Sequence, residues 1–194
     1  KGVELGLAED TRGTRKLLSH YEIKKPIERF DEYSKEGKYK EIAEYLNQDK
    51  DIALVTDAGT PGISDPAARL VSHIRNFNFE ILPIPGPSAL ISALSVSGLN
   101  SDQFTFLGYP PHKKGRQTFF KSIKDIGIRP LVLYESPHRI QKTFLSIVGI
   151  FGEDYEILVA KELTKIYEEI WRGKVVEAIK YFTGLKGKGE FVII

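Results

Sequence analysis

Short apolar runs alternate with amphipathic stretches along the chain. Runs of about four to eight apolar residues between turn residues are typical of buried strands, whereas apolar residues spaced by three and four are typical of helices. Strands are predicted at residues 3–8, 52–56, 79–84, 104–107, 131–135, 156–161, 168–172 and 190–194. Helices are predicted at residues 12–21, 38–48, 66–76, 88–97, 137–151 and 175–182.

This alternation of strands and helices predicts an α/β protein with a mixed sheet in each half. A polar break at residues 98–103 separates the two halves. We therefore expect an N-terminal α/β domain over residues 1–102 and a C-terminal α/β domain over residues 103–194.

The composition excludes several kinds of chemistry. The chain has no cysteine, which excludes disulfides, thiolate metal ligands and a cysteine nucleophile. Its four histidines are not grouped as ligands, so no metal is predicted. No apolar run approaches the roughly 20 residues that a membrane helix needs, and no signal-peptide pattern is visible. These features favour a cytoplasmic protein without a membrane partner.

A loop rich in glycine and proline, TDAGTPGISDP at residues 56–66, leaves a predicted buried strand and enters a helix. Ligands of open α/β sheets bind at the carboxyl ends of strands, and Gly59 and Gly62 allow close approach of the backbone. No Gly-Lys-Ser/Thr follows, which argues against a triphosphate. Asp57 suits a ligand with hydroxyls or an amine. The alternative is a plain strand–helix connection stiffened by glycine and proline.

A second loop of this kind, PIPGPSA, covers residues 83–89. Three prolines around one glycine indicate a rigid turn. Ser88 is suited to capping the next helix. Taken alone, a helix cap and a ligand contact explain this loop equally well.

Several segments together resemble one family. They are AEDTRGTRKLL, LVTDAGTPGISDP, PIPGPSALISALSVSGL, FLGYPPHKKGR, LVLYESPHRI, AKELTKIYEEIWRG and KGEFVII, in this order over nearly the whole chain. The resemblance is to the ribosomal RNA small subunit methyltransferase I family of the tetrapyrrole methylase superfamily. It implies two α/β domains that bind S-adenosylmethionine in a cleft between them. It also implies 2′-O-methylation of a cytidine in the decoding region of 16S rRNA by a homodimer.

The family's cofactor-binding positions carry over to eleven residues of this chain. They are Asp57, Ala58, Gly59, Thr60, Ile63, Ser64, Ser88, Ala89, Tyr134, Leu163 and Thr164. The family opens with a strand and a Pro-Ile-Gly-Asn loop that forms part of the cleft. This chain begins with Lys1 and has no methionine, so we expect that an N-terminal element precedes it. Some relatives also continue beyond the position of Ile194.

A ribose hydroxyl is a weak nucleophile, so a base or a cation near it would assist methyl transfer. Lys161 and Glu162 follow a predicted strand and are the preferred candidates, with Glu135 as a third. Glu9 and Asp10 also lie at a strand end. The alternative is that these side chains form an ion-pair network between the domains.

RNA binding needs clustered cations for phosphates and aromatic side chains for unstacked bases. Three clusters qualify: Arg12, Arg15 and Lys16; Lys113, Lys114 and Arg116, which follow Tyr109 and His112; and His138 with Arg139. Two other functions remain open on the sequence alone. One is methylation of a tetrapyrrole or a similar small molecule, and the other is a non-catalytic RNA-binding protein that kept the fold.

Overall fold

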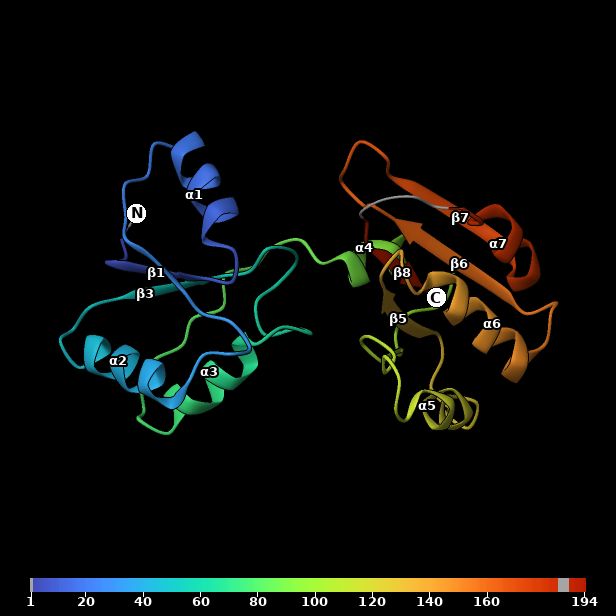
Figure 1. Ribbon diagram of the computed structural model, residues 1–194, viewed down its shortest axis with the longest axis horizontal. Helices are drawn as coiled ribbons and strands as arrows, with labels where there is room; N and C mark the ends of the chain where they lie inside the picture. The colour runs from blue at the N-terminus through green and yellow to red at the C-terminus, as the bar shows by residue number, and fades with distance from the viewer. Residues whose placement is uncertain (1, 185–188) are drawn as a thin grey trace. The chain divides into compact units, whose positions relative to one another are not determined.

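A computed structural model describes residues 2–184 and 189–194. The chain forms two compact units, Lys1–Pro87 and Ser88–Ile194, each considered separately below (Figure 1). The division by contacts lies between Pro87 and Ser88, earlier than the boundary expected after residue 102. The reason is helix α4 (Ala89–Ser95), which buries Leu90, Ala93 and Leu94 in a hydrophobic cluster of the second unit.

The first unit contains a three-stranded sheet in the order β2-β1-β3, formed by Ile27–Arg29, Leu5–Ala8 and Ile52–Val55. Both pairings are parallel, so the mixed sheet expected in this half is not observed among the described residues. Helix α1 (Thr11–His20) connects β1 to β2, and α2 (Glu36–Leu46) connects β2 to β3. Such crossovers are what parallel pairing requires.

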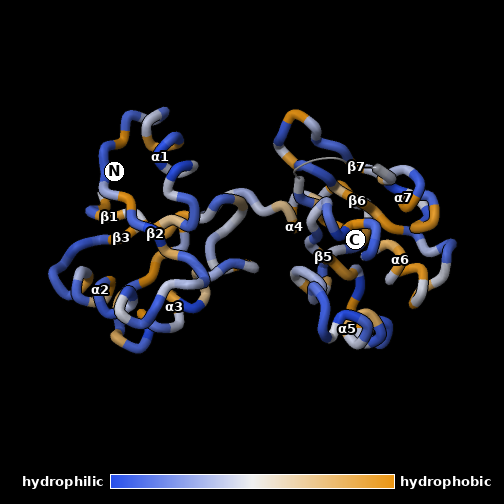
Figure 2. Tube along the Cα trace, in the orientation of Figure 1, coloured by the Kyte–Doolittle hydropathy of each residue, from blue (hydrophilic) through white to orange (hydrophobic). Residues whose placement is uncertain are grey.

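The core of the first unit lies on the side of the sheet that α2 and α3 (Ala67–Arg75) cover. Leu7 and Phe30 meet Ile42 of α2 and Leu70 of α3 there. Helix α1 contributes little to this core, because Thr14 is its one buried residue. Its hydrophilic character is visible in Figure 2.

The strand predicted at residues 79–84 is wrong: this segment joins no sheet in the described structure. Pro83 and Pro85 have no backbone N–H to donate to a neighbouring strand. Leu82 and Ile84 are 69% and 82% exposed, so the apolar run does not reflect burial within this unit.

The second unit contains a five-stranded mixed sheet in the order β4-β5-β8-β6-β7. The strands are β4 (Thr105–Phe106), β5 (Leu131–Glu135), β6 (Glu156–Lys161), β7 (Glu169–Lys174) and β8 (Phe191–Ile193). Strands β4 and β5 are parallel, and the remaining pairs are antiparallel. The mixed sheet expected in this half is therefore confirmed.

Alternate residues along these strands enter two different hydrophobic clusters. Val132 and Leu158 pack with α4, whereas Leu133 and Ile157 pack with α5 (Arg116–Ile123), α6 (Ile140–Phe151) and α7 (Val175–Tyr181). Because successive side chains of a strand point to opposite faces, the sheet is covered on both sides. None of the helices in the described part of the chain has the length and apolar character needed to cross a bilayer.

Candidate functional site

The conformation of the loop after β3 is set by three residues with positive φ angles and by the hydrogen bonds of one carboxylate. Gly59, Gly62 and Ser64 have φ angles of 71°, 89° and 62°, and this left-handed conformation is costly for serine. Asp65 Oδ1 accepts hydrogen bonds from the amides of Gly62 at 2.8 Å and Ala67 at 2.9 Å. Asp65 thus shapes the loop and satisfies an amide at the start of α3, a role that its position before the helix could have revealed.

Acidic side chains gather where β1 and β3 end side by side. Ala8 pairs with Val55, and just beyond them the Asp10 amide donates to Asp57 Oδ1 at 3.3 Å. Burial raises the pKa of Glu9, and the negative charges of Asp57 and Asp65 raise it further. This edge is therefore electronegative, which favours a ligand carrying positive charge or hydroxyl donors.

The two loops rich in glycine and proline lie in contact within the first unit. The Thr60 hydroxyl donates to the Pro87 carbonyl oxygen at 3.5 Å. Ser88, the next residue, occupies the N-cap position of α4, but its side chain makes no capping hydrogen bond, so the capping role considered for it is not observed. Its hydroxyl is therefore not committed to the helix.

In the second unit, three of the family's cofactor positions meet on one face of the sheet. Ala89, Tyr134 and Leu163 all pack against the cluster around Val132 and Leu158. Tyr134 Oη accepts a hydrogen bond from the Leu90 amide at 3.2 Å. The next position, Thr164, has a φ of 66°, and its amide donates to the Glu168 carboxylate.

Lys161 and Glu162, the preferred acceptor-side candidates, are engaged in ion pairs within their own unit. Lys161 Nζ lies 3.3 Å from Glu169 Oε2. Glu162 Oε1 lies 2.8 Å from Lys165 Nζ and accepts the Glu190 amide at 3.2 Å. These pairs hold residues of the β6–β7 hairpin together. They leave the side chains of Lys161 and Glu162 less free to contact an acceptor hydroxyl.

Glu135, the third candidate, is fully buried and fully engaged. Its carboxylate accepts hydrogen bonds from the Ser136 amide at 2.8 Å and the Thr143 hydroxyl at 2.6 Å. Arg139 Nη2 lies 2.6 Å from the same carboxylate. A base must reach the proton that it removes, so this geometry favours a different role for Glu135.

The cationic residues predicted to bind RNA divide into exposed and enclosed ones. The exposed ones are Arg12, Arg15, Lys16, Lys113, Lys114 and His138. Arg116 is only 4% exposed, because it begins α5 and points into the unit. The sequence groups Arg116 with the exposed Lys113 and Lys114 as an RNA-binding residue, but its burial and the helix that it begins are not evident from this basic run. Arg139, whose side chain is 17% exposed, joins Glu135 instead of lying free on the surface.

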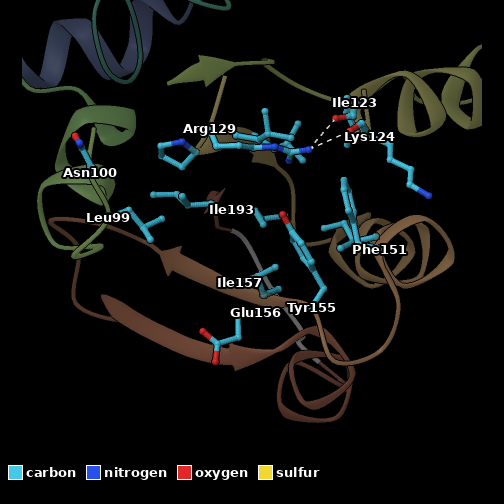
Figure 3. A pocket seen from close by; sticks show the side chains of 15 residues that line it. Leu99, Asn100, Ile123, Lys124, Arg129, Phe151, Tyr155, Glu156, Ile157 and Ile193 are labelled. Atoms are coloured by element: carbon cyan, nitrogen blue, oxygen red, sulfur yellow. Dashed lines mark hydrogen bonds between the residues drawn. The ribbon is translucent and has the colours of Figure 1, made fainter. Parts of the chain in front are cut away.

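A separate apolar pocket of ≈ 740 Å³ lies in the second unit (Figure 3). It is located where β5 and β6 begin, and Leu131 and Ile157 line it. Tyr134 and Lys161, in contrast, lie at the other ends of these strands. Arg129 lines the pocket and donates to the carbonyl oxygens of Ile123 and Lys124 at 3.5 and 3.2 Å. The pocket contains none of the predicted site residues.

Within residues 2–184 and 189–194, no three His, Asp or Glu side chains gather in a way that could hold a metal ion. The candidate chemistry therefore concerns the two loops, the β5 end and the β6–β7 connection. The first loop, the β5 end and the β6–β7 connection follow strands, as expected for a ligand-binding edge, whereas the second loop does not, because residues 79–84 join no sheet in the described structure.

Comparison with known proteins identifies the class to which this fold and these loops belong. The model of the family Tetrapyrrole (Corrin/Porphyrin) Methylases matches residues 4–179. The chain also has the fold of a cobalt precorrin-4 methyltransferase, with a TM-score of 0.69 at 12% identity, covering 98% of this chain and 83% of that one.

More similar sequences narrow this class. A Thermotoga maritima protein named ribosomal RNA small subunit methyltransferase I is 44% identical over 192 residues, covering 99% of this chain and 86% of that protein. A Synechocystis protein of the same name is 43% identical over 193 residues, covering 99% of this chain and 69% of that protein. The chain therefore belongs to the tetrapyrrole methylase family, among the proteins named ribosomal RNA small subunit methyltransferase I.

Proposed function

We propose that this protein transfers a methyl group from S-adenosylmethionine to the 2′-hydroxyl of a cytidine in the decoding region of 16S rRNA. The observation that carries the proposal is the 44% identity, over 99% of the chain, to a relative named for methylation of small-subunit rRNA. We further propose that the protein acts in the cytoplasm as a homodimer, as the family resemblance implies.

The residues of the first loop fit the cofactor. A Cβ added at Gly59 or Gly62 would meet nothing within 4 Å, so the backbone there is open to a ligand. Asp65 Oδ2 is buried and has no hydrogen-bond partner in the described chain. Asp57 is exposed at the strand end. Backbone amides and a carboxylate are suitable partners for the ribose hydroxyls and cationic groups of S-adenosylmethionine.

We assign the cofactor contacts to the eleven family positions. In the first loop, these contacts would come from Asp57, Ala58, Gly59, Thr60, Ile63 and Ser64. In the second unit, they would come from Ser88, Ala89, Tyr134, Leu163 and Thr164. When bound, the sulfonium provides an already activated methyl group. The protein then has mainly to align the acceptor and exclude water.

On the acceptor side, the ion pairs of Lys161 and Glu162 are compatible with orienting the ribose hydroxyl or stabilising its alkoxide. Glu9 is the better candidate for accepting the proton, because it is exposed and its pKa is raised. A higher pKa makes a carboxylate a stronger base. A Glu9→Gln variant should then lose kcat and the acidic limb of the pH–rate profile, whereas Glu162→Gln should retain that limb.

The proposed activity is tested by transfer of radiolabelled methyl groups to small ribosomal subunits that lack the modification. Labelled 16S rRNA is then hydrolysed with alkali, because a 2′-O-methyl group protects the adjacent phosphodiester. We expect label in an alkali-resistant dinucleotide that begins with cytidine. Label on a tetrapyrrole acceptor alone would contradict the proposal in favour of small-molecule methylation. Binding of RNA without transfer would favour the non-catalytic alternative.

A further inference from the structure

The buried carboxylate at the end of β5 is linked to an exposed basic loop through two arginines. This loop, here termed the basic loop, comprises residues 109–115 between β4 and α5. Its tip, His112, Lys113 and Lys114, is exposed, whereas Pro110 at its base is buried. Prolines 110 and 111 have no N–H to donate. The backbone of the loop base can therefore be anchored only through its carbonyl oxygens.

Each arginine contacts both Glu135 and one carbonyl oxygen of the loop base. Arg139 Nη2 lies 2.6 Å from Glu135 Oε1, and Arg139 Nη1 donates to the Pro110 oxygen at 3.1 Å. Arg116 Nη1 lies 3.8 Å from Glu135 Oε2 and donates to the Pro111 oxygen at 3.3 Å. The two successive carbonyls of the loop base are therefore held by two guanidinium groups that share one carboxylate.

Thr143 of α6 completes this arrangement. Its hydroxyl donates to Glu135 Oε2 at 2.6 Å and accepts from Arg116 Nη2 at 2.7 Å. Arg116 also lies over the Phe120 ring, with 4.9 Å between the guanidinium carbon and the ring centroid. A buried charge network of this kind is costly unless its members are paired. Buried ion pairs generally contribute little net stability relative to well-packed apolar side chains, so a geometric role accounts better for this one.

We propose that Glu135, Arg116 and Arg139 form a positioning clamp that presents Lys113 and Lys114 to RNA phosphates. The arginines act through the basic loop and do not themselves contact RNA. This inference rests on the proposed function for the identity of the partner, but the clamp itself is a property of the free protein. Neither Glu135 nor Arg116 has the exposure that phosphate contact requires.

The clamp is tested first without RNA, by hydrogen exchange of the amides of residues 112–116. Arg139→Met is the preferred variant, because Glu135 keeps its contacts with Arg116, Thr143 and Ser136 and the fold should persist. We expect faster exchange in the basic loop and unchanged exchange in β5 and α6. Arg172→Met is the matched control, since Arg172 is an exposed arginine paired with Glu156. Unchanged exchange in the loop of Arg139→Met would overturn the clamp.

The indirect role is tested by a double-mutant cycle with Lys113→Ala/Lys114→Ala. Alone, Arg139→Met should raise KM for the small subunit by roughly threefold to tenfold, leaving kcat and the Kd of S-adenosylmethionine unchanged. In the background without the two lysines, the same change should raise KM no further. If the KM increases of Arg139→Met and Lys113→Ala/Lys114→Ala instead multiply in the combined variant, Arg139 contacts RNA directly.

A further variant examines the centre of the clamp. Glu135→Gln keeps the side-chain volume but removes the charge that both arginines share. We expect faster loop exchange and a higher KM for RNA at temperatures well below the unfolding midpoint. A lower kcat at unchanged KM would mark Glu135 as catalytic and overturn the positioning role. If the wild-type protein neither binds nor methylates RNA, the proposed function fails, while the exchange experiment still decides whether the clamp exists.

Discussion

Tyr134 Oη accepts a hydrogen bond from the backbone amide of Leu90 at 3.2 Å, which joins the end of β5 to the first turn of α4. The Tyr134 ring also packs against Phe106 and Tyr109, with ring centroids 4.9 and 5.5 Å apart. The neighbouring Glu135 holds the base of the basic loop on the other face of the sheet. One dipeptide at the end of β5 therefore positions a proposed cofactor loop and a proposed RNA-binding loop.

Tyr134→Phe should weaken binding of S-adenosylmethionine while leaving the aromatic packing in place. The phenol oxygen accepts from the Leu90 amide in the first turn of α4, next to Ser88 and Ala89, so its loss leaves that amide without this hydrogen bond. We expect a stability loss of about 0.5–1.5 kcal/mol by urea titration and a several-fold higher Kd by calorimetry. Tyr155→Phe, in the pocket at the opposite end of the sheet, is the control for loss of a hydroxyl. Equal Kd values for both variants would contradict the role of Tyr134.

Asp57→Ala should reduce cofactor affinity much more than stability. Asp57 is exposed and accepts a single amide bond from Asp10 at 3.3 Å, so the fold depends little on it. Loss of a charged hydrogen bond to the ligand costs about 1.5–3 kcal/mol, or roughly tenfold to a hundredfold in Kd. Calorimetry with S-adenosylmethionine measures this change, and Asp125→Ala provides a control at another exposed aspartate. An unaltered Kd would remove Asp57 from the cofactor site.

Much of the second unit's sheet could be predicted from the sequence, because β5, β6 and β8 are largely buried apolar runs. Residues 131–135 and 156–161 were predicted with the bounds that β5 and β6 have. Strand β2 was missed because three residues give no measurable periodicity. Helix α5 was missed because its first residue belongs to a basic run that resembles a solvated loop.

The enclosure of Arg116 and Glu135 is the clearest example of what local sequence does not reveal. Their pairing depends on Thr143 and Pro111, which come from different elements and meet only in the folded unit. A pattern of charges along the chain shows how many cations a segment has, but not which of them a buried carboxylate withdraws from the surface. The exposure of Gly59 and Asp57, in contrast, is what a loop directly after a strand predicts.

Glu9→Gln should stabilise the first unit at neutral pH and have no effect in acid. Burial, followed by the charges of Asp57 and Asp65, raises the pKa of Glu9 in the folded protein above 4.5. The folded state therefore favours the protonated form, and stability is lost as pH rises through this raised pKa. Unfolding midpoints should differ between variant and wild type at pH 7 and converge below pH 4.5. Glu44→Gln, at an exposed position of α2, controls for the loss of one charge. A difference that persists in acid would show that packing is its cause.

Ile147→Phe should stabilise the second unit by filling part of the apolar pocket. Ile147 is 4% exposed within the core and also lines the pocket of ≈ 740 Å³, so added carbon atoms have space available. Filling a cavity in this way commonly adds about 0.5–2 kcal/mol. The matched control is Ile140→Phe, because Ile140 is 0% exposed in the same core and does not line the pocket. Overpacking there should cost about 1–3 kcal/mol. Urea titration of both variants measures the contrast, and equal destabilisation by the two would show that the pocket cannot accept a larger side chain.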